Sequence, residues 1–157
     1  MYTVTNKKLC EVYPGFSENK ERYKKRIEAV KDGYKKVFGN EETRIFTAPG
    51  RTEIGGNHTD HQHGCVLAAA VDLDILAAVA ENGTNKIRVL SDGYDMLEID
   101  LSDLKPMEEE KNTSAALIRG IAAKLAEMGY KIKGFNAYMI SNVLKGSGLS
   151  SSAAFEV

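Results

Sequence analysis

Lys145-Gly146-Ser147-Gly148-Leu149-Ser150-Ser151-Ser152-Ala153-Ala154 is the stretch from which the fold of this chain can be inferred. It follows an alternating run at residues 134–141, which predicts a β-strand, and it leads into residues 153–157, which predict the first turn of a helix. A strand, a glycine-serine loop and a helix start together direct backbone N–H groups at an anion. Glycine lets the backbone approach phosphate oxygens, and serine hydroxyls suit phosphate or magnesium. The stretch therefore predicts a phosphate-binding loop, although an ordinary glycine-serine turn that caps a helix is the alternative. It lacks the Gly-Lys-Ser/Thr ending of the Walker loop.

The length and charge of the chain exclude several classes of protein. Its 157 residues fit one domain. Lys and Arg number 21 against 22 Asp and Glu, so the net charge of −1 gives no electrostatic argument for a nucleic-acid or membrane partner. No apolar run approaches membrane-spanning length, and the N-terminus lacks a signal-peptide core. Cys10 and Cys65 are far apart, which favours reduced thiols in a cytoplasmic protein.

The end of the chain predicts a truncated protein. Only residues 153–157 follow the serines, and a helix that short is marginal by itself. We therefore expect the chain to be part of a longer protein. Apolar surface that the rest would cover should then be exposed, and such surface favours self-association.

Helical periodicity predicts helices at residues 18–38 and 113–128. The expected caps are Ser17 and Gly39 for the first helix, and Asn112 or Thr113 and then Gly129 for the second. The apolar stripe of the first helix consists of Tyr23, Ile27, Val30, Tyr34, Val37 and Phe38. The stripe of the second, expected in the core, consists of Leu117, Ile121, Leu125 and Met128.

The strands indicate the fold class. A strand at residues 44–48 is expected to stop at Pro49-Gly50. Residues 65–101 predict an antiparallel meander with buried strands, whose tight turns lie at Asn82-Gly83 and Asp92-Gly93. Strands in a block with helices interspersed predict an α+β fold, with a mixed or antiparallel sheet and packed helices.

Residues 48–64 are the second informative stretch. They are rich in glycine and hydrogen-bonding side chains between two apolar segments, and loops of this kind carry binding sites more often than packing. One hypothesis for them is a metal-binding module, because His and Asp are common metal ligands. Its ligands would be His58, Asp60, His61 and His63.

Together the two stretches resemble a known family. The segment from Pro49-Gly50-Arg51 to His58-Thr59-Asp60, followed by Val66-Leu67, resembles the galactokinase signature. The glycine-serine loop resembles the second motif of the GHMP kinases, which include galactokinase, homoserine kinase and mevalonate kinase. The resemblance extends from Val37 to the end of the chain. It implies that residues 1–157 form the N-terminal part of a GHMP kinase, without the C-terminal domain.

The resemblance also implies an activity and the residues that carry it. The activity is ATP-dependent phosphorylation of galactose at the anomeric hydroxyl, which gives galactose 1-phosphate, with Mg²⁺ as the metal. Arg51 would stabilise charge on the transferring phosphoryl group. The sugar would be held by Asn57, His58, Thr59 and Asp60. ATP would be held by Ser91, Gly146, Ser147, Gly148, Leu149, Ser150, Ser151 and Ser152, and Ser152 would also bind magnesium.

Some positions depart from the family pattern. The chain has Glu53 in place of Asn, Asn57 in place of Glu, His61 in place of Tyr and Ala68 in place of Pro. A related hexose, a modified galactose or a weakened enzyme is therefore an alternative to phosphorylation of galactose itself. A sensor that binds sugar or nucleotide without catalysis is a further alternative. The resemblance places the catalytic aspartate and a third glycine-rich motif after Val157, so these residues alone are expected to be inactive.

Overall fold

The computed structural model describes residues 6–13, 15–56, 63–143, 146 and 148–157. In chain order the elements are α1 (Asn6–Val12), α2 (Phe16–Phe38), β1 (Arg44–Gly55), β2 (Leu67–Glu81), β3 (Lys86–Ser91), β4 (Leu97–Asp100), the 3₁₀-helix η2 (Glu108–Glu110), α3 (Ser114–Glu127), β5 (Phe135–Ser141) and α4 (Ser151–Glu156). No helix among these residues is long and apolar enough to cross a membrane.

The sheet is mixed, and this confirms the predicted α+β class. Its order is β1-β2-β5-β3-β4, in which β3 and β5 are parallel and the other neighbours antiparallel. The predicted meander over 65–101 is wrong, because β5 lies between β2 and β3. Gly134 makes this insertion possible, since a Cβ there would lie 2.3 Å from the carbonyl oxygen of Thr84. The expected burial is also wrong for residues 65–68 and for Ala70, which are exposed.

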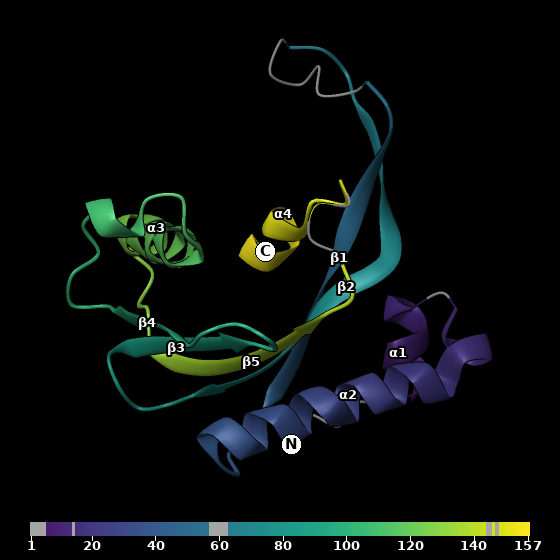
Figure 1. The fold of residues 1–157 in the computed structure, drawn as a ribbon, viewed down its shortest axis with the longest axis horizontal. Helices are drawn as coiled ribbons and strands as arrows, with labels where there is room; N and C mark the ends of the chain where they lie inside the picture. The colour runs from purple at the N-terminus through teal and green to yellow at the C-terminus, as the bar shows by residue number, and fades with distance from the viewer. Residues whose placement is uncertain (1–5, 14, 57–62, 144–145, 147) are drawn as a thin grey trace.

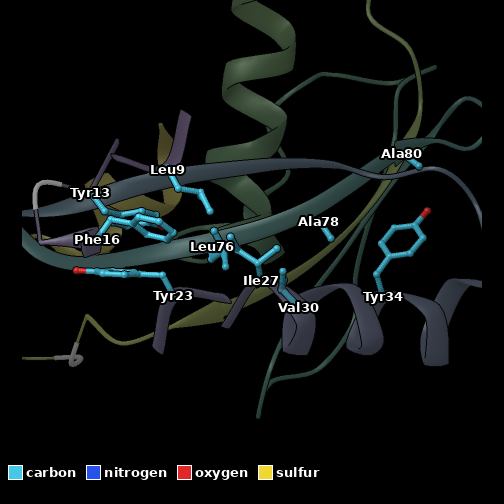
Figure 2. Close-up of a cluster of buried hydrophobic side chains, with 10 residues drawn as sticks. All are labelled: Leu9, Tyr13, Phe16, Tyr23, Ile27, Val30, Tyr34, Leu76, Ala78 and Ala80. Atoms are coloured by element: carbon cyan, nitrogen blue, oxygen red, sulfur yellow. The ribbon is translucent and has the colours of Figure 1, made fainter. Parts of the chain in front are cut away.

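Helices cover both faces of the sheet. In Figure 1, α1 and α2 lie on one side, and α3 and α4 lie on the other. One core cluster joins α1 and α2 to β2, and it includes Leu9, Phe16, Tyr23, Val30 and Leu76 (Figure 2). A second packs α3 against β3, β4 and β5, and a third packs α4 against β2.

The predicted apolar stripe of α2 is largely confirmed, whereas the predicted start of the helix at residue 18 is wrong. Tyr23, Ile27, Val30 and Tyr34 are buried. Val37 is exposed, whereas Phe38 packs against the buried cluster. The helix begins at Phe16 with Gly15 as the N-cap, so Ser17 is inside it. Burial of Phe16 against Tyr23 stabilises the earlier start.

The α3 cap is confirmed, but its predicted core stripe is partly wrong. The hydroxyl of Thr113 accepts a hydrogen bond from the N–H of Ala116. Leu125 and Met128 are exposed. The side that packs on the sheet instead carries Ala115, Ile118 and Ala122. The buried Arg119, paired with Glu110, fixes this orientation of the helix.

Strand β1 does not stop at Pro49-Gly50, as predicted, but continues to Gly55. The register between β1 and β2 shifts between Pro49 and Arg51. A bulge tolerates proline because the ladder there does not need its missing N–H. Beyond the bulge the β1–β2 ribbon extends past the rest of the sheet (Figure 1).

Candidate functional site

The glycine-serine loop has an unusual backbone. Gly146 and Gly148 have φ values of 76° and 74°, and Ser150, the N-cap of α4, has a φ of 57°. Space is open where a Cβ of either glycine would lie, so the fold requires glycine here for its backbone angles. A serine with positive φ costs roughly 1–3 kcal/mol, and such strain persists only where the surroundings enforce it. Helix α4 begins at Ser151, earlier than the predicted residue 153.

A pocket of about 570 Å³ opens beside this loop. Ser151 and Ser152 of α4 line it, and so does Ser91 at the end of β3. These serines were predicted from separate stretches of the sequence, and the fold brings them to one cavity. Its remaining lining residues are Ile75, Asp92, Tyr94, Asp95, Leu97, Ser114, Leu117, Met139, Ile140, Ser141, Val143 and Phe155.

The turn between β3 and β4 contributes polar groups that the sequence analysis missed. Asp92, Tyr94 and Asp95 line the pocket, although Asp92 was predicted only as part of a tight turn. The N–H of Asp92 donates to the carbonyl of Met139 over 2.9 Å, and the hydroxyl of Tyr138 donates to Asp92 Oδ1 over 3.0 Å. Burial and the neighbouring Asp92 carboxylate raise the pKa of Tyr138, which keeps the hydroxyl a donor. Both bonds fix this turn to β5.

Arg51 lies next to the glycine-serine loop. Its backbone N–H donates to the carbonyl of Leu149 over 2.9 Å. Gly50 allows this approach, because a Cβ there would lie 3.0 Å from the Leu149 oxygen. The Arg51 side chain is half exposed, and its Nη2 lies 3.5 Å from Glu53 Oε1. The two stretches singled out in the sequence are therefore in direct contact.

Several predicted site residues lie outside the described residues: Asn57, His58, Thr59, Asp60 and Ser147. The predicted metal ligand His61, which stands where the family pattern has Tyr, lies outside them too. His63 is described and exposed, with a φ of 60°. Across residues 6–13, 15–56, 63–143, 146 and 148–157, no three His, Cys, Asp or Glu side chains gather as metal ligands. The metal-binding hypothesis for His58, Asp60, His61 and His63 therefore stays a prediction.

Comparison by family, by sequence and by structure finds galactokinases in each case. The family described as "Galactokinase galactose-binding signature" matches residues 32–81. A galactokinase from Clostridium tetani is 31% identical over 132 residues, which cover 83% of this chain and 33% of the relative. The crystal structure of Lactococcus lactis galactokinase complexed with galactose matches with a TM-score of 0.75 and 28% identity, over 83% of this chain and 34% of that one.

The fold is shared more widely. The Methanococcus jannaschii mevalonate kinase matches with a TM-score of 0.59 at 18% identity, over 74% of this chain and 38% of that one. At that identity the likeness concerns the fold alone. The chain spans about a third of the length of the curated relatives that it matches.

Proposed function

This chain is a relative of the galactokinases that carries their galactose-binding signature, and on that premise we propose that it supplies the sugar-binding and phosphate-binding part of a kinase that phosphorylates galactose with ATP. The observation that carries the proposal is the bond from the Arg51 N–H to the Leu149 carbonyl. It holds the strand of the galactose-binding signature against the loop whose serines line the pocket. Acceptor sugar and donor phosphate would then meet at Arg51.

The pocket beside α4 suits the nucleotide. Its volume of about 570 Å³ lies within the usual range for ligand sites. Its lining combines apolar residues with Ser91, Ser151 and Ser152, whose side chains carry hydroxyls. In the proposed complex the ATP phosphates lie along Gly146–Ser152 and the adenosine lies toward Ser91. Use of ATP suits a cytoplasmic location.

Arg51 is proposed to act on the reaction itself. Its guanidinium carries a permanent positive charge and is half exposed, so it can reach a bound phosphate. Charge that builds on the transferring phosphoryl group is stabilised by such a cation. The proposed sugar contacts come from Asn57, His58, Thr59 and Asp60, whose side chains can donate to and accept from hydroxyls.

Magnesium fits the donor set of the pocket. Mg²⁺ prefers oxygen ligands and often takes most of them from substrate phosphates and water. Ser152, which lines the pocket, would supply the protein ligand, and Ser151 lies beside it. When bound, the ion would neutralise phosphate charge.

The test is a kinase assay on the intact protein. With ATP and galactose we expect ADP release coupled to galactose 1-phosphate, which phosphorus NMR identifies. Glucose and a sugar-free reaction are the controls. Arg51→Ala should remove most of the turnover, whereas Arg88→Ala, which removes an arginine paired with Glu98 on β3, should not. Sugar and ATP binding without turnover would instead favour the sensor hypothesis.

A further inference from the structure

The position of Arg51 depends on the bulge in the β1–β2 ribbon. Pro49 pairs with Asp74 and Arg51 pairs with Ala70, so β2 has residues 71–73 opposite Gly50 alone. Extra residues in one strand bend the ribbon and change the direction of its side chains. Whatever holds this bulge therefore also sets where Arg51 lies.

A buried carboxylate lies at the bulge. Asp74 is 4% exposed, and its side chain accepts hydrogen bonds from Tyr13 and from Thr47 on β1, each over 2.5 Å. The guanidinium of Arg26 on α2 forms an ion pair with the same carboxylate. Tyr13 is in turn held by its stacking on Tyr23, with ring centroids 4.3 Å apart (Figure 2). Asp74 thus connects β2 to β1 and to the N-terminal helices.

This cluster is not explained by stability alone. A buried ion pair contributes little beyond what well-packed apolar side chains of the same volume would give, because both charges lose their hydration. What charged, directional bonds add is a fixed geometry. At Asp74 the side-chain bonds fix the bend of the β1–β2 ribbon. The backbone of the same residue fixes the chain that leads to the glycine-serine loop.

The chain that leads toward the loop is attached to Asp74. Asn142 follows β5, and its Oδ1 accepts the N–H of Asp74 over 2.7 Å. In return the N–H of Asn142 donates to the carbonyl of Asp74 over 3.2 Å. Toward its end the loop is attached at Leu149, whose carbonyl accepts the N–H of Arg51. Both attachments are to the bulged part of the ribbon.

We propose that Asp74 is a positioning residue that sets the phosphate-binding loop relative to Arg51. Its carboxylate fixes the bulge to α2 and to Tyr13, and its backbone fixes Asn142, which lies between β5 and the loop. This inference rests on the proposed function, because it treats the loop as the site of the ATP phosphates. Asn142 is the second positioning residue, since it carries the connection to the loop.

The test uses the intact protein and a set of matched variants. Asp74→Asn keeps the shape of the side chain and removes its charge. Asn142→Ala removes the acceptor for the Asp74 N–H, and Asn142→Asp restores an acceptor. Glu110→Gln is the control, because it removes the charge from another buried ion pair, with Arg119, away from the ribbon.

The kinetic result separates positioning from folding. Loss of one hydrogen bond corresponds to roughly a five-fold change in affinity. Asp74→Asn and Asn142→Ala should raise the KM for ATP and the Kd of a fluorescent ATP analogue by about that factor, with the galactose KM changed less than about two-fold. Asn142→Asp should recover most of the loss. A lower melting temperature with both KM values unchanged, as expected for Glu110→Gln, would overturn the inference.

Backbone hydrogen exchange tests the attachment without a nucleotide. Asp74→Asn should speed exchange at the amides of Arg51 and Asn142, and Glu110→Gln should leave both unchanged. Unchanged exchange in Asp74→Asn would overturn the inference even if the protein phosphorylates galactose. Faster exchange and weaker binding of the ATP analogue, in a protein that does not phosphorylate galactose, would support the inference and reject the proposed function.

Discussion

Gly33 in α2 offers the sharpest test of the packing. In an exposed helix, Gly→Ala stabilises by roughly 1 kcal/mol. Here a Cβ on Gly33 would lie 2.1 Å from Cε1 and 2.4 Å from Cζ of Tyr138 on β5. The ring cannot move away without disturbing the bond from its hydroxyl to Asp92. Overpacking costs about 1–3 kcal/mol and the hydrogen bond about 1. The gain in helix propensity offsets about 1 kcal/mol of these two costs. Gly33→Ala should therefore destabilise the protein by about 1–3 kcal/mol in total.

A second substitution should reverse the sign of the stability change that Gly33→Ala causes. In a Tyr138→Ala background the clash is absent, so Gly33→Ala should stabilise by up to about 1 kcal/mol, as helix propensity dictates. Urea denaturation of the four proteins of this double-mutant cycle gives the coupling. The same effect of Gly33→Ala in both backgrounds, or stabilisation in the unmodified protein, would refute the packing of α2 on Tyr138.

Four further predictions concern single groups. Burial, and then the bond to a carboxylate, raise the pKa of Tyr13 to about 12. Because the folded state holds this proton more tightly, about 2–3 kcal/mol of stability should be lost as the pH rises from 10 to 12, and in stability measurements Tyr13→Phe should show a shallower alkaline loss. Arg51→Ala should lower kcat more than it raises the galactose KM, and Arg51→Lys should recover only part of the loss; steady-state kinetics showing an effect on KM alone would contradict this role. Asp60→Ala should chiefly raise the galactose KM, by roughly ten- to a hundred-fold, and a selective fall in kcat would exclude it as a sugar ligand. Glu110→Ala should lower the free energy of unfolding by about 2 kcal/mol, because it leaves the buried guanidinium of Arg119 without its carboxylate; an unchanged urea midpoint would contradict the pairing.

Local signals in the sequence were sufficient for several elements. The spacing of Tyr23, Ile27, Val30 and Tyr34 identified the buried side of α2, because a helical period of 3.6 places them on one face. The start of α3 followed from the side chain of Thr113, which caps the helix locally. Alternation identified β5 to within one residue. The loop glycines, Gly146 and Gly148, stand where the backbone needs positive φ.

Other expectations failed where distant parts of the chain decide the outcome. Nothing near Pro49 reveals that β2 will pair across the bulge and carry β1 onward. The exposure of Leu125 and Met128 depends on how α3 is rotated, and the pairing of Arg119 with Glu110 determines that. Helix α1 was not predicted at all. It is short, and its stability comes from packing Leu9 and the following Tyr13 against α2 and β2 rather than from periodicity.

The sequence by itself identified the two motif stretches, the buried face of α2 and the α+β class, because each follows from side-chain type and spacing along the chain. Only the tertiary structure decided that β5 enters between β2 and β3 and that Ser91 shares a pocket with Ser151 and Ser152. It also decided that the N–H of Arg51 reaches Leu149. These are pairings between distant residues, and their free energy comes from burial and hydrogen bonds that no local pattern records.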